Sequence, residues 1–189
     1  MAERYFDLCD DIMIPGRWEL GELLHANGQE LEDPWVFRVS EPVQLRERLR
    51  VSLVRKGFPV DFSHAAFSTP EVHVRAAEIF YRLAPDDIQL IPVDVDGHPD
   101  QYLVLNAIRL IKCIDENATE ELERWTPEDG RPDKIGKYRA VYGMRIDPSK
   151  VGGAKVFRTW GWSVALVVSG EIKDALEAAG ITGLEFKEV

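Results

Sequence analysis

Four side chains that could bind a metal alternate around a glycine near the middle of this 189-residue chain. They lie in the stretch DVDGHPD, and oxygen ligands at alternate positions around a glycine are typical of calcium loops. A calcium loop also needs a bidentate glutamate further along, whereas here a β-rich run resumes at Gln101. A hairpin turn explains the same Asp, Gly and Pro residues, so the sequence predicts a turn and no metal site. The side chains concerned are Asp94, Asp96, His98 and Asp100.

A second set of residues could support hydrolysis, because Asp61 and His64 lie close together in the sequence. Such a pair can act as a general base when a nucleophile is within reach. No serine or cysteine stands in a GxSxG pattern, however, and the HExxH, Walker and GxGxxG spacings are also absent. We therefore predict no catalytic residue, no cofactor-binding residue, no metal ligand and no enzymatic activity. A hydrolase built on this pair is the weakest alternative.

The residues that could instead bind a partner form an acidic run around a tryptophan. The chain carries 33 acids against 23 Lys and Arg, and its net charge of −10 repels the phosphates of nucleic acid. Residues 83–129 and residues 1–40 hold most of the excess. Either the acids form a solvated face, or they attract a basic protein partner, with the tryptophan as an exposed anchor. The candidate partner-binding residues are Asp115, Glu116, Glu120, Glu121, Glu123, Trp125, Glu128 and Asp129.

Three helices are predicted from hydrophobic spacing and from capping residues. Leucines recur every four residues between arginines, which predicts an amphipathic helix over 41–55. Thr69 is suited to cap a second helix, with Pro70 at its first position, that runs to about Leu83. Ser169 can cap a third, short helix with the sequence EIKDALEAA.

The remaining regular elements are predicted to be strands. The runs at 88–95 and 101–115 flank a turn and predict an antiparallel hairpin, with the second run apolar on both faces and therefore central in a sheet. Strands outnumber helices and do not alternate with them, so we predict an α+β fold with a mixed, largely antiparallel sheet and a few packed helices. Further strands are expected at 138–146, 155–158, 163–168 and in the tail ITGLEFKEV.

No targeting or membrane segment is expected. No run approaches the roughly 20 apolar residues that a membrane helix needs, and the start MAERYFDLCDD lacks the regions of a signal peptide. We therefore predict a cytoplasmic protein without membrane contact. The two cysteines, Cys9 and Cys113, cannot form a disulfide framework or a complete zinc site and are predicted to be reduced.

Four stretches of the chain, taken in order, carry a family resemblance. They are DFS with FS and Pro in 59–72, QLIPV in 86–95, YLVLN followed by CID in 101–119, and FR, VS, IK and ITG in 155–189. Together they resemble a bacterial immunity-protein family, long catalogued as a domain of unknown function, whose members accompany polymorphic toxins and are common in myxobacteria. The resemblance covers roughly residues 58–189.

The resemblance implies a non-enzymatic immunity protein that binds a cognate toxin encoded by a neighbouring gene, in a pair of the kind that serves kin discrimination. It implies that the toxin is neutralised because its active surface is covered, and that neither catalytic residues nor cofactors take part. The acidic balance suits a toxin with a basic surface, such as a nuclease. A regulatory or scaffold partner of a non-toxin protein encoded nearby is the alternative.

The extent of the resemblance also suggests how the chain is divided. Residues 58–189 are expected to form the immunity-family α+β domain. Residues 1–57 match the family only loosely, so this N-terminal segment either packs into the same core or forms a small separate lobe.

Overall fold

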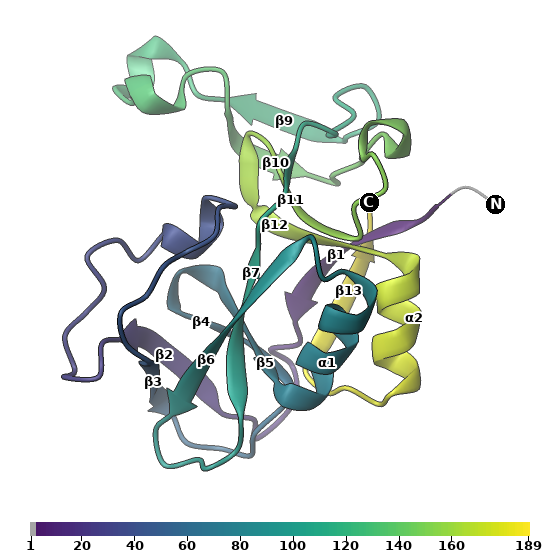
Figure 1. Ribbon diagram of the computed structural model, residues 1–189. Helices are drawn as coiled ribbons and strands as arrows, with labels where there is room; N and C mark the ends of the chain where they lie inside the picture. The colour runs from purple at the N-terminus through teal and green to yellow at the C-terminus, as the bar shows by residue number, and fades with distance from the viewer. Residues whose placement is uncertain (1–2) are drawn as a thin grey trace.

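The computed structural model describes residues 3–189, which form two large β-sheets, a two-stranded ribbon and two α-helices (Figure 1). Most neighbouring strands are antiparallel and two pairs are parallel, so the predicted α+β fold with a mixed sheet is confirmed. Neither of the two helices described is long and apolar enough to cross a membrane. The helices are α1 (Val74–Leu83) and α2 (Gly170–Ala178). The strands are β1 (Tyr5–Asp10), β2 (Glu19–Leu24), β3 (Leu49–Arg55), β4 (Phe62–Ala65), β5 (Thr69–His73), β6 (Ile88–Val95), β7 (Tyr102–Ala107), β8 (Leu110–Ile111), β9 (Glu121–Arg124), β10 (Tyr138–Tyr142), β11 (Val156–Thr159), β12 (Trp162–Ser169) and β13 (Leu184–Glu188).

The six-stranded sheet is strongly curled around a core of its own. Its strand order is β2-β3-β6-β7-β5-β4, and the two outer strands, β2 and β4, contact each other. Trp18 Nε1 donates a hydrogen bond of 2.9 Å to Ser63 Oγ and so joins these outer strands inside the curl. Phe37, in the short turn η1 (Val36–Arg38), packs onto the same core. The core contains Trp18, Leu20, Leu23, Phe37, Leu49, Val51, Val93, Val95, Tyr102 and Val104 among its buried residues.

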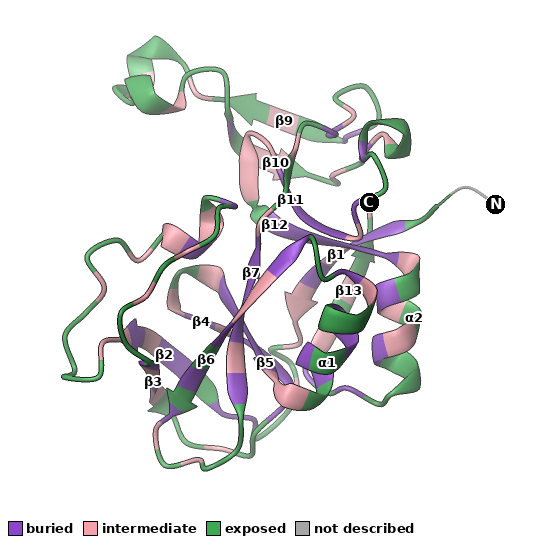
Figure 2. Cartoon of the chain, viewed as in Figure 1, coloured by how far each residue is buried: buried purple, intermediate pink, exposed green. Residues whose placement is uncertain are grey.

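A second core lies between the curled sheet and the five-stranded sheet, which has the order β13-β1-β12-β11-β8. Both α-helices cover this core, and Figure 2 shows that their buried residues face the sheets. It contains Phe62, Val72 and Leu105 from the curled sheet, Phe6, Leu8, Val156 and Leu166 from the other sheet, and Phe80, Ile172 and Leu176 from the helices. One continuous apolar layer therefore holds the two sheets together.

Residues 3–57 contribute strands to both large sheets. β1 lies between β13 and β12, so that Phe6 stands opposite both Glu188 and Val168. β2 and β3 form one side of the curled sheet, and β3 runs parallel to β6. The division into an N-terminal segment, residues 1–57, and an immunity-family domain, residues 58–189, stays a prediction.

The helix predicted over 41–55 is wrong. Residues 41–48 contain no helix, and the following residues form strand β3 between β2 and β6. A spacing of four places side chains on one face of a helix, but it also places them on one face of a strand, whose period is two. Leu49 and Val51 are fully buried in the curled sheet, so burial of alternate residues decides the conformation.

The helix predicted to start at Pro70 begins four residues later. Thr69–His73 is strand β5, which pairs with β4 on one side and β7 on the other. Two strand neighbours satisfy backbone groups that a helix start at this point would leave unpaired. His73 is the residue that caps α1, because its Nδ1 accepts a hydrogen bond from the Arg75 N–H at 3.3 Å.

The hairpin predicted from the middle of the chain is confirmed. β6 and β7 pair antiparallel, with Ile91 opposite Val104, and β7 is central because β5 pairs with its other edge. The second strand is shorter than expected, however, since it ends at Ala107 and the chain crosses to the other sheet as β8. Ser169 caps α2 as predicted, accepting a hydrogen bond from the Ile172 N–H at 3.4 Å. The other expected strands are present as β10 to β13, of which β10 stops at residue 142.

One carboxyl group is enclosed in the curled sheet without a partner. Glu71 stands opposite Val104, so its side chain shares the face that lines the core. The side chain is fully buried, and neither carboxylate oxygen has a hydrogen-bond partner among residues 3–189. Burial raises the pKa of Glu71 from 4.5 to about 8, because the charged form loses its hydration.

We predict that the buried carboxyl of Glu71 makes the stability fall as the pH rises. The folded chain holds this proton more tightly than the unfolded chain, so the free energy of unfolding is greatest below pH 4.5 and falls until about pH 8. The fall is about 1.4 kcal/mol for each pH unit inside this window. Urea unfolding of the native chain and of Glu71→Gln across the window measures it. Equal pH slopes in the two proteins would contradict the prediction.

Candidate functional site

A two-stranded ribbon projects from the five-stranded sheet and carries most of the predicted acidic residues (Figure 1). β9 and β10 pair antiparallel, with Leu122 opposite Val141. The tip between them contains two short turns, η3 (Pro127–Asp129) and η4 (Pro132–Lys134). Tyr138 anchors the ribbon to the body, because its side chain is buried and its N–H donates to the Gly161 carbonyl at 3.0 Å.

Three of the seven predicted carboxylates are paired with arginines of the same ribbon. Arg124 lies 2.6 Å from Glu116. Arg139 lies 3.5 Å from Glu123 and 3.1 Å from Asp129. Arg139 follows the acidic run in the sequence and returns onto it only because β9 and β10 pair. The ribbon is therefore less negative than the run of acids in the sequence indicates.

The other four carboxylates of the run form no salt bridge with a described residue, but one of them accepts hydrogen bonds from the backbone. Glu120, Glu121 and Glu128 are exposed and form no salt bridge with a described residue. Glu121 stands opposite Tyr142, whose side chain is 56% exposed, so the two residues form an outward surface of the ribbon. Asp115 accepts two backbone N–H groups of the turn that follows it and so has a structural use. Three free carboxylates remain available to a partner.

Trp125 is half-buried, although the sequence predicts an exposed anchor. Its Nε1 donates a hydrogen bond to the Tyr138 carbonyl at 3.1 Å, and Lys134 Nζ lies 4.8 Å from the centre of its ring. The hydrogen bond joins Trp125 to β10, and the contact with Lys134 joins it to η4 in the tip. The indole therefore holds the tip in place, and its role in partner binding stays a prediction.

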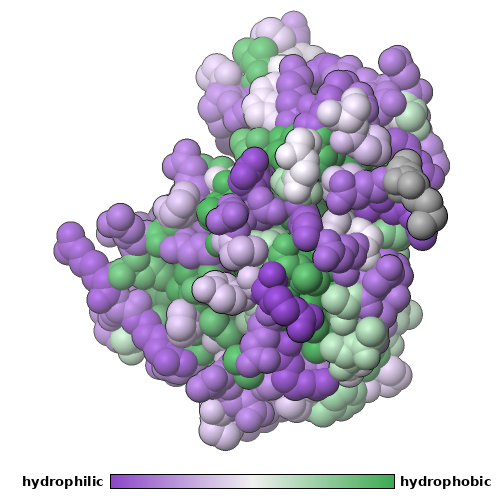
Figure 3. Space-filling view, turned by 45° about the vertical axis from the view of Figure 1, so that its right-hand side comes forward, coloured by the Kyte–Doolittle hydropathy of each residue, from purple (hydrophilic) through white to green (hydrophobic). Residues whose placement is uncertain are grey.

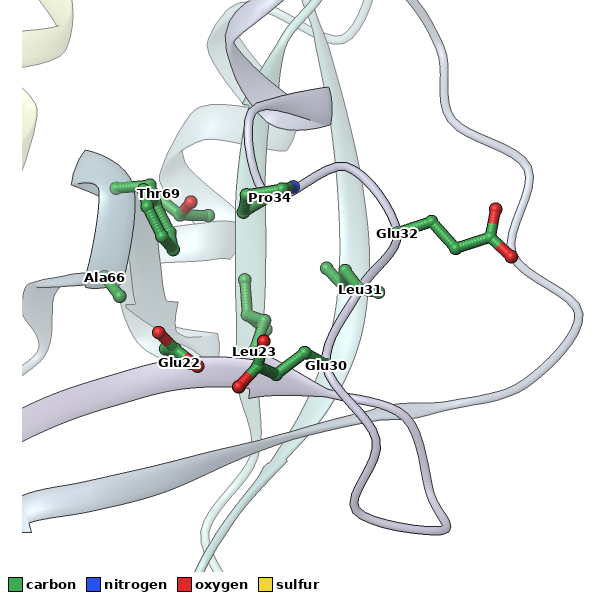
Figure 4. A pocket seen from close by; sticks show the side chains of 9 residues that line it. Glu22, Leu23, Glu30, Leu31, Glu32, Pro34, Ala66 and Thr69 are labelled. Atoms are coloured by element: carbon green, nitrogen blue, oxygen red, sulfur yellow. The ribbon is translucent and has the colours of Figure 1, made fainter.

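A second group of unpaired acids borders a cavity beside the outer strand β2 (Figure 4). The cavity has a volume of about 220 Å³ and lies between β2 and the turn η2 (Ala66–Ser68). A tight turn returns the chain along β2, with Leu24 paired to Glu30, and Figure 4 shows Glu22 and Glu30 on the same side of the cavity. Neither carboxylate forms a salt bridge with a described residue. Glu32 also belongs to the lining but points away from the cavity.

Two exposed aromatic rings accompany this cavity. Phe67 lines it, and Trp35 packs edge-on against Phe67 with 4.8 Å between the ring centres. The side chains are 36% and 47% exposed. Phe67 and Ser68 have φ angles of 61° and 55°, a left-handed conformation that costs non-glycine residues about 1 to 2 kcal/mol each. Such strain is frequent at functional sites, where it holds a side chain in a required position.

The acid–base pair considered for a hydrolase is not formed. His64 Nδ1 lies 2.9 Å from Asp10 Oδ1, so this histidine has a different carboxylate as its partner. Asp61 accepts hydrogen bonds of 2.9 Å from the N–H and the hydroxyl of Thr182 and lies 3.4 Å from Arg75. Asp61 and His64 therefore form separate contacts, each with a residue from another part of the chain.

The stretch considered as a calcium loop is the end of β6 and the turn into β7. Asp94 lies 2.8 Å from Arg48, and Asp96 lies 2.7 Å from Arg50. In the part of the chain that the structure describes, no three His, Cys, Asp or Glu side chains are grouped so that they could hold a metal ion. These aspartates instead join the turn to β3 and the segment before it.

A comparison with protein families matches residues 4–189 to the immunity protein family Imm11. The chain belongs to this family. A search of curated proteins found no match. The expected family resemblance is confirmed, and it extends over β1 to β3 as well as over the C-terminal part. Membership gives this Imm11 chain the general role of an immunity protein, which is to neutralise a toxin.

The sequence did not predict the cavity of this Imm11 chain. Its lining comes from β2, from the segment around Glu30 and from the stretch between Ala66 and Thr69, which only the curl of the sheet brings together. The available signal was the acid excess of residues 1–40 around Trp35. That signal indicates a charged surface but not a concave one.

We predict that Ser68→Gly stabilises the Imm11 chain. Glycine adopts a left-handed backbone without the steric cost that serine carries, so the free energy of unfolding should rise by about 1 kcal/mol. Urea or thermal unfolding measures the change. Ser52→Gly, in the extended strand β3, is the matched control and should lower the stability. A loss of stability in Ser68→Gly would show that the turn carries no such strain.

Proposed function

We propose that this Imm11 chain binds the toxin encoded by a neighbouring gene and neutralises it by covering the toxin's active surface. The observation that carries the proposal is the family match over residues 4–189. The action we propose is stoichiometric binding in the cytoplasm, without catalysis. A nuclease is the toxin class that suits the charge of the chain.

The distribution of free carboxylates supports this proposal. The chain has a net charge of −10, and its unpaired acids include Glu120, Glu121 and Glu128 on the ribbon and Glu22 and Glu30 beside the cavity. A nuclease needs basic residues where it holds phosphates, so an acidic surface complements it. Attraction between such surfaces speeds association and weakens as salt is added.

The form of the ribbon supports the proposal that the toxin's active surface is covered. β9 and β10 stand away from the two packed sheets, and the region at the top of the space-filling view is mainly hydrophilic (Figures 1 and 3). A projecting element can enter a concave active site while the rest of the chain stays outside it. Arg139 holds the acids of β9 and of the tip to β10, so the ribbon needs little reordering on binding.

The proposal is tested by co-purification of the tagged chain with the product of the neighbouring gene. Growth is then compared in cells that express this product with and without the chain. We expect a stable complex and rescued growth. Binding to a product that is not toxic would overturn the proposal in favour of a regulatory or scaffold partner, and absence of binding would overturn both.

We predict that neutralising the free acids of the ribbon slows association with the toxin. In the triple variant Glu120→Gln, Glu121→Gln and Glu128→Gln, the association rate constant should fall about tenfold at low salt, because the long-range attraction is reduced. The difference should shrink at high salt, where exposed charges are screened. Stopped-flow or surface-plasmon measurements across a salt series give the rate constants.

A second triple variant controls for net charge alone. Glu78→Gln, Asp86→Asn and Asp100→Asn change the charge by the same amount, on exposed residues of α1, of the segment after it and of the β6–β7 turn. These elements lie away from the ribbon (Figure 1). We expect a smaller effect on association from this variant. Equal effects of the two triple variants would show that the ribbon has no special part in steering.

A further inference from the structure

The cavity beside β2 has the size and lining for one charged side chain. Its volume of about 220 Å³ is below the roughly 300 to 1,000 Å³ of typical small-molecule sites. Five of its nine lining residues are apolar, and the charged ones are all glutamates. A wall of this kind suits a long aliphatic stem that ends in a positive charge. The lining comprises Glu22, Leu23, Glu30, Leu31, Glu32, Pro34, Ala66, Phe67 and Thr69.

Two carboxylates at this cavity lack a counter-charge. Glu22 and Glu30 lie on the same side of it (Figure 4), and no described lysine or arginine forms a salt bridge with either of them. Like charges held side by side repel each other, so a cation placed between them is favoured. Glu22 is partly buried, which reduces the screening of its charge by water.

A buried threonine also lines the cavity. Thr69 is 1% exposed and belongs to the lining. Glu71, two residues along on the same face of β5, is fully buried, and neither of its carboxylate oxygens has a hydrogen-bond partner among residues 3–189. A threonine hydroxyl can accept a hydrogen bond, so Thr69 offers an acceptor to a ligand that supplies an N–H donor.

The aromatic residues favour a guanidinium over an ammonium group. A guanidinium is planar, stacks on aromatic rings and offers several N–H donors in one plane. Phe67 presents its ring at the cavity, and the guanidinium of Arg38 already lies 4.9 Å from the centre of the Trp35 ring beside it. Stacking of an arginine on these rings is therefore compatible with the local geometry.

We propose that this cavity receives an arginine side chain of the toxin. Glu22 and Glu30 supply the counter-charges, the Thr69 hydroxyl accepts one N–H, and the ring of Phe67 lies against the guanidinium. The identity of the partner rests on the function proposed above, whereas the preference of the cavity for a guanidinium does not. The basic surface of a nuclease is a natural source of such an arginine.

The preference for a guanidinium is tested with N-acetyl-arginine amide as the probe. NMR spectra of the full ¹⁵N-labelled chain, recorded during titration, report which residues sense it. We expect saturable shifts confined to residues 22–24, 30–35 and 66–69. We expect about tenfold weaker binding to Thr69→Val, because a hydrogen bond to a charged donor is lost, and no saturable binding to Glu22→Gln/Glu30→Gln.

Two matched controls keep this experiment decisive. Glu120→Gln/Glu121→Gln makes the same change of charge on the ribbon and should bind the probe as the native chain does. N-acetyl-norleucine amide has an apolar stem without a charge and should cause no saturable shift in the cavity. Equal binding of the two probes would overturn the inference, and so would undiminished binding of the arginine probe to Glu22→Gln/Glu30→Gln. Unchanged NMR signals outside the cavity show that this variant is folded.

Binding of the toxin itself separates this inference from the proposed function. If the cavity takes a toxin arginine, Glu22→Gln/Glu30→Gln should raise the dissociation constant at least about tenfold, mainly through faster dissociation. If this variant neutralises the toxin fully and the native chain does not bind the arginine probe, the proposal that the cavity binds an arginine is overturned, while the proposed function stands. Probe binding by a chain that neutralises no toxin would overturn the proposed partner instead.

Discussion

The hydrogen bond from Trp18 to Ser63 joins the two outer strands of the curled sheet, and the rest of this half of the molecule depends on that closure. β2 and β4 are the two ends of the hydrogen-bonded sheet, and their contact covers edges that in other proteins invite pairing with foreign strands. Arg17 strengthens the joint because it donates to Ser63 Oγ at 3.0 Å and lies 3.2 Å from Asp10. Since β2 and β4 meet, the turn η2 lies beside β2, and the acidic cavity exists only there.

Local patterns in the sequence predict those elements whose signals are also local. The hairpin of β6 and β7 and the cap at Ser169 depend on residues that are close in the chain. Strand β3 could not be predicted in this way, because a four-residue spacing fits a helix and a strand equally. β1 was not predicted either, since its partners β12 and β13 lie at the other end of the chain and only their pairing makes it a central strand.

The candidate site shows the same division between local and distant signals. The acidic run was visible in the sequence, but which acids are free depends on Arg139, which the pairing of β9 with β10 brings within 3.5 Å of Glu123. The cavity combines Glu22 with Thr69, and these residues meet only because the sheet curls. Composition could therefore indicate an acidic surface, whereas it could not indicate where that surface is concave or unpaired.

The two groups of free acids suit two different requirements of an immunity protein. In the complex that we propose, exposed carboxylates on the ribbon act over about 8 Å at physiological salt, so they would influence how often a basic partner arrives in a productive orientation. Carboxylates at the cavity would act at short range with less screening and so influence how long the partner stays. The strained turn at Phe67 and Ser68 would hold an aromatic ring in place before binding and so lower the entropy cost of recognition. A chain that must intercept a toxin quickly and then not release it gains from keeping these two tasks on separate surfaces.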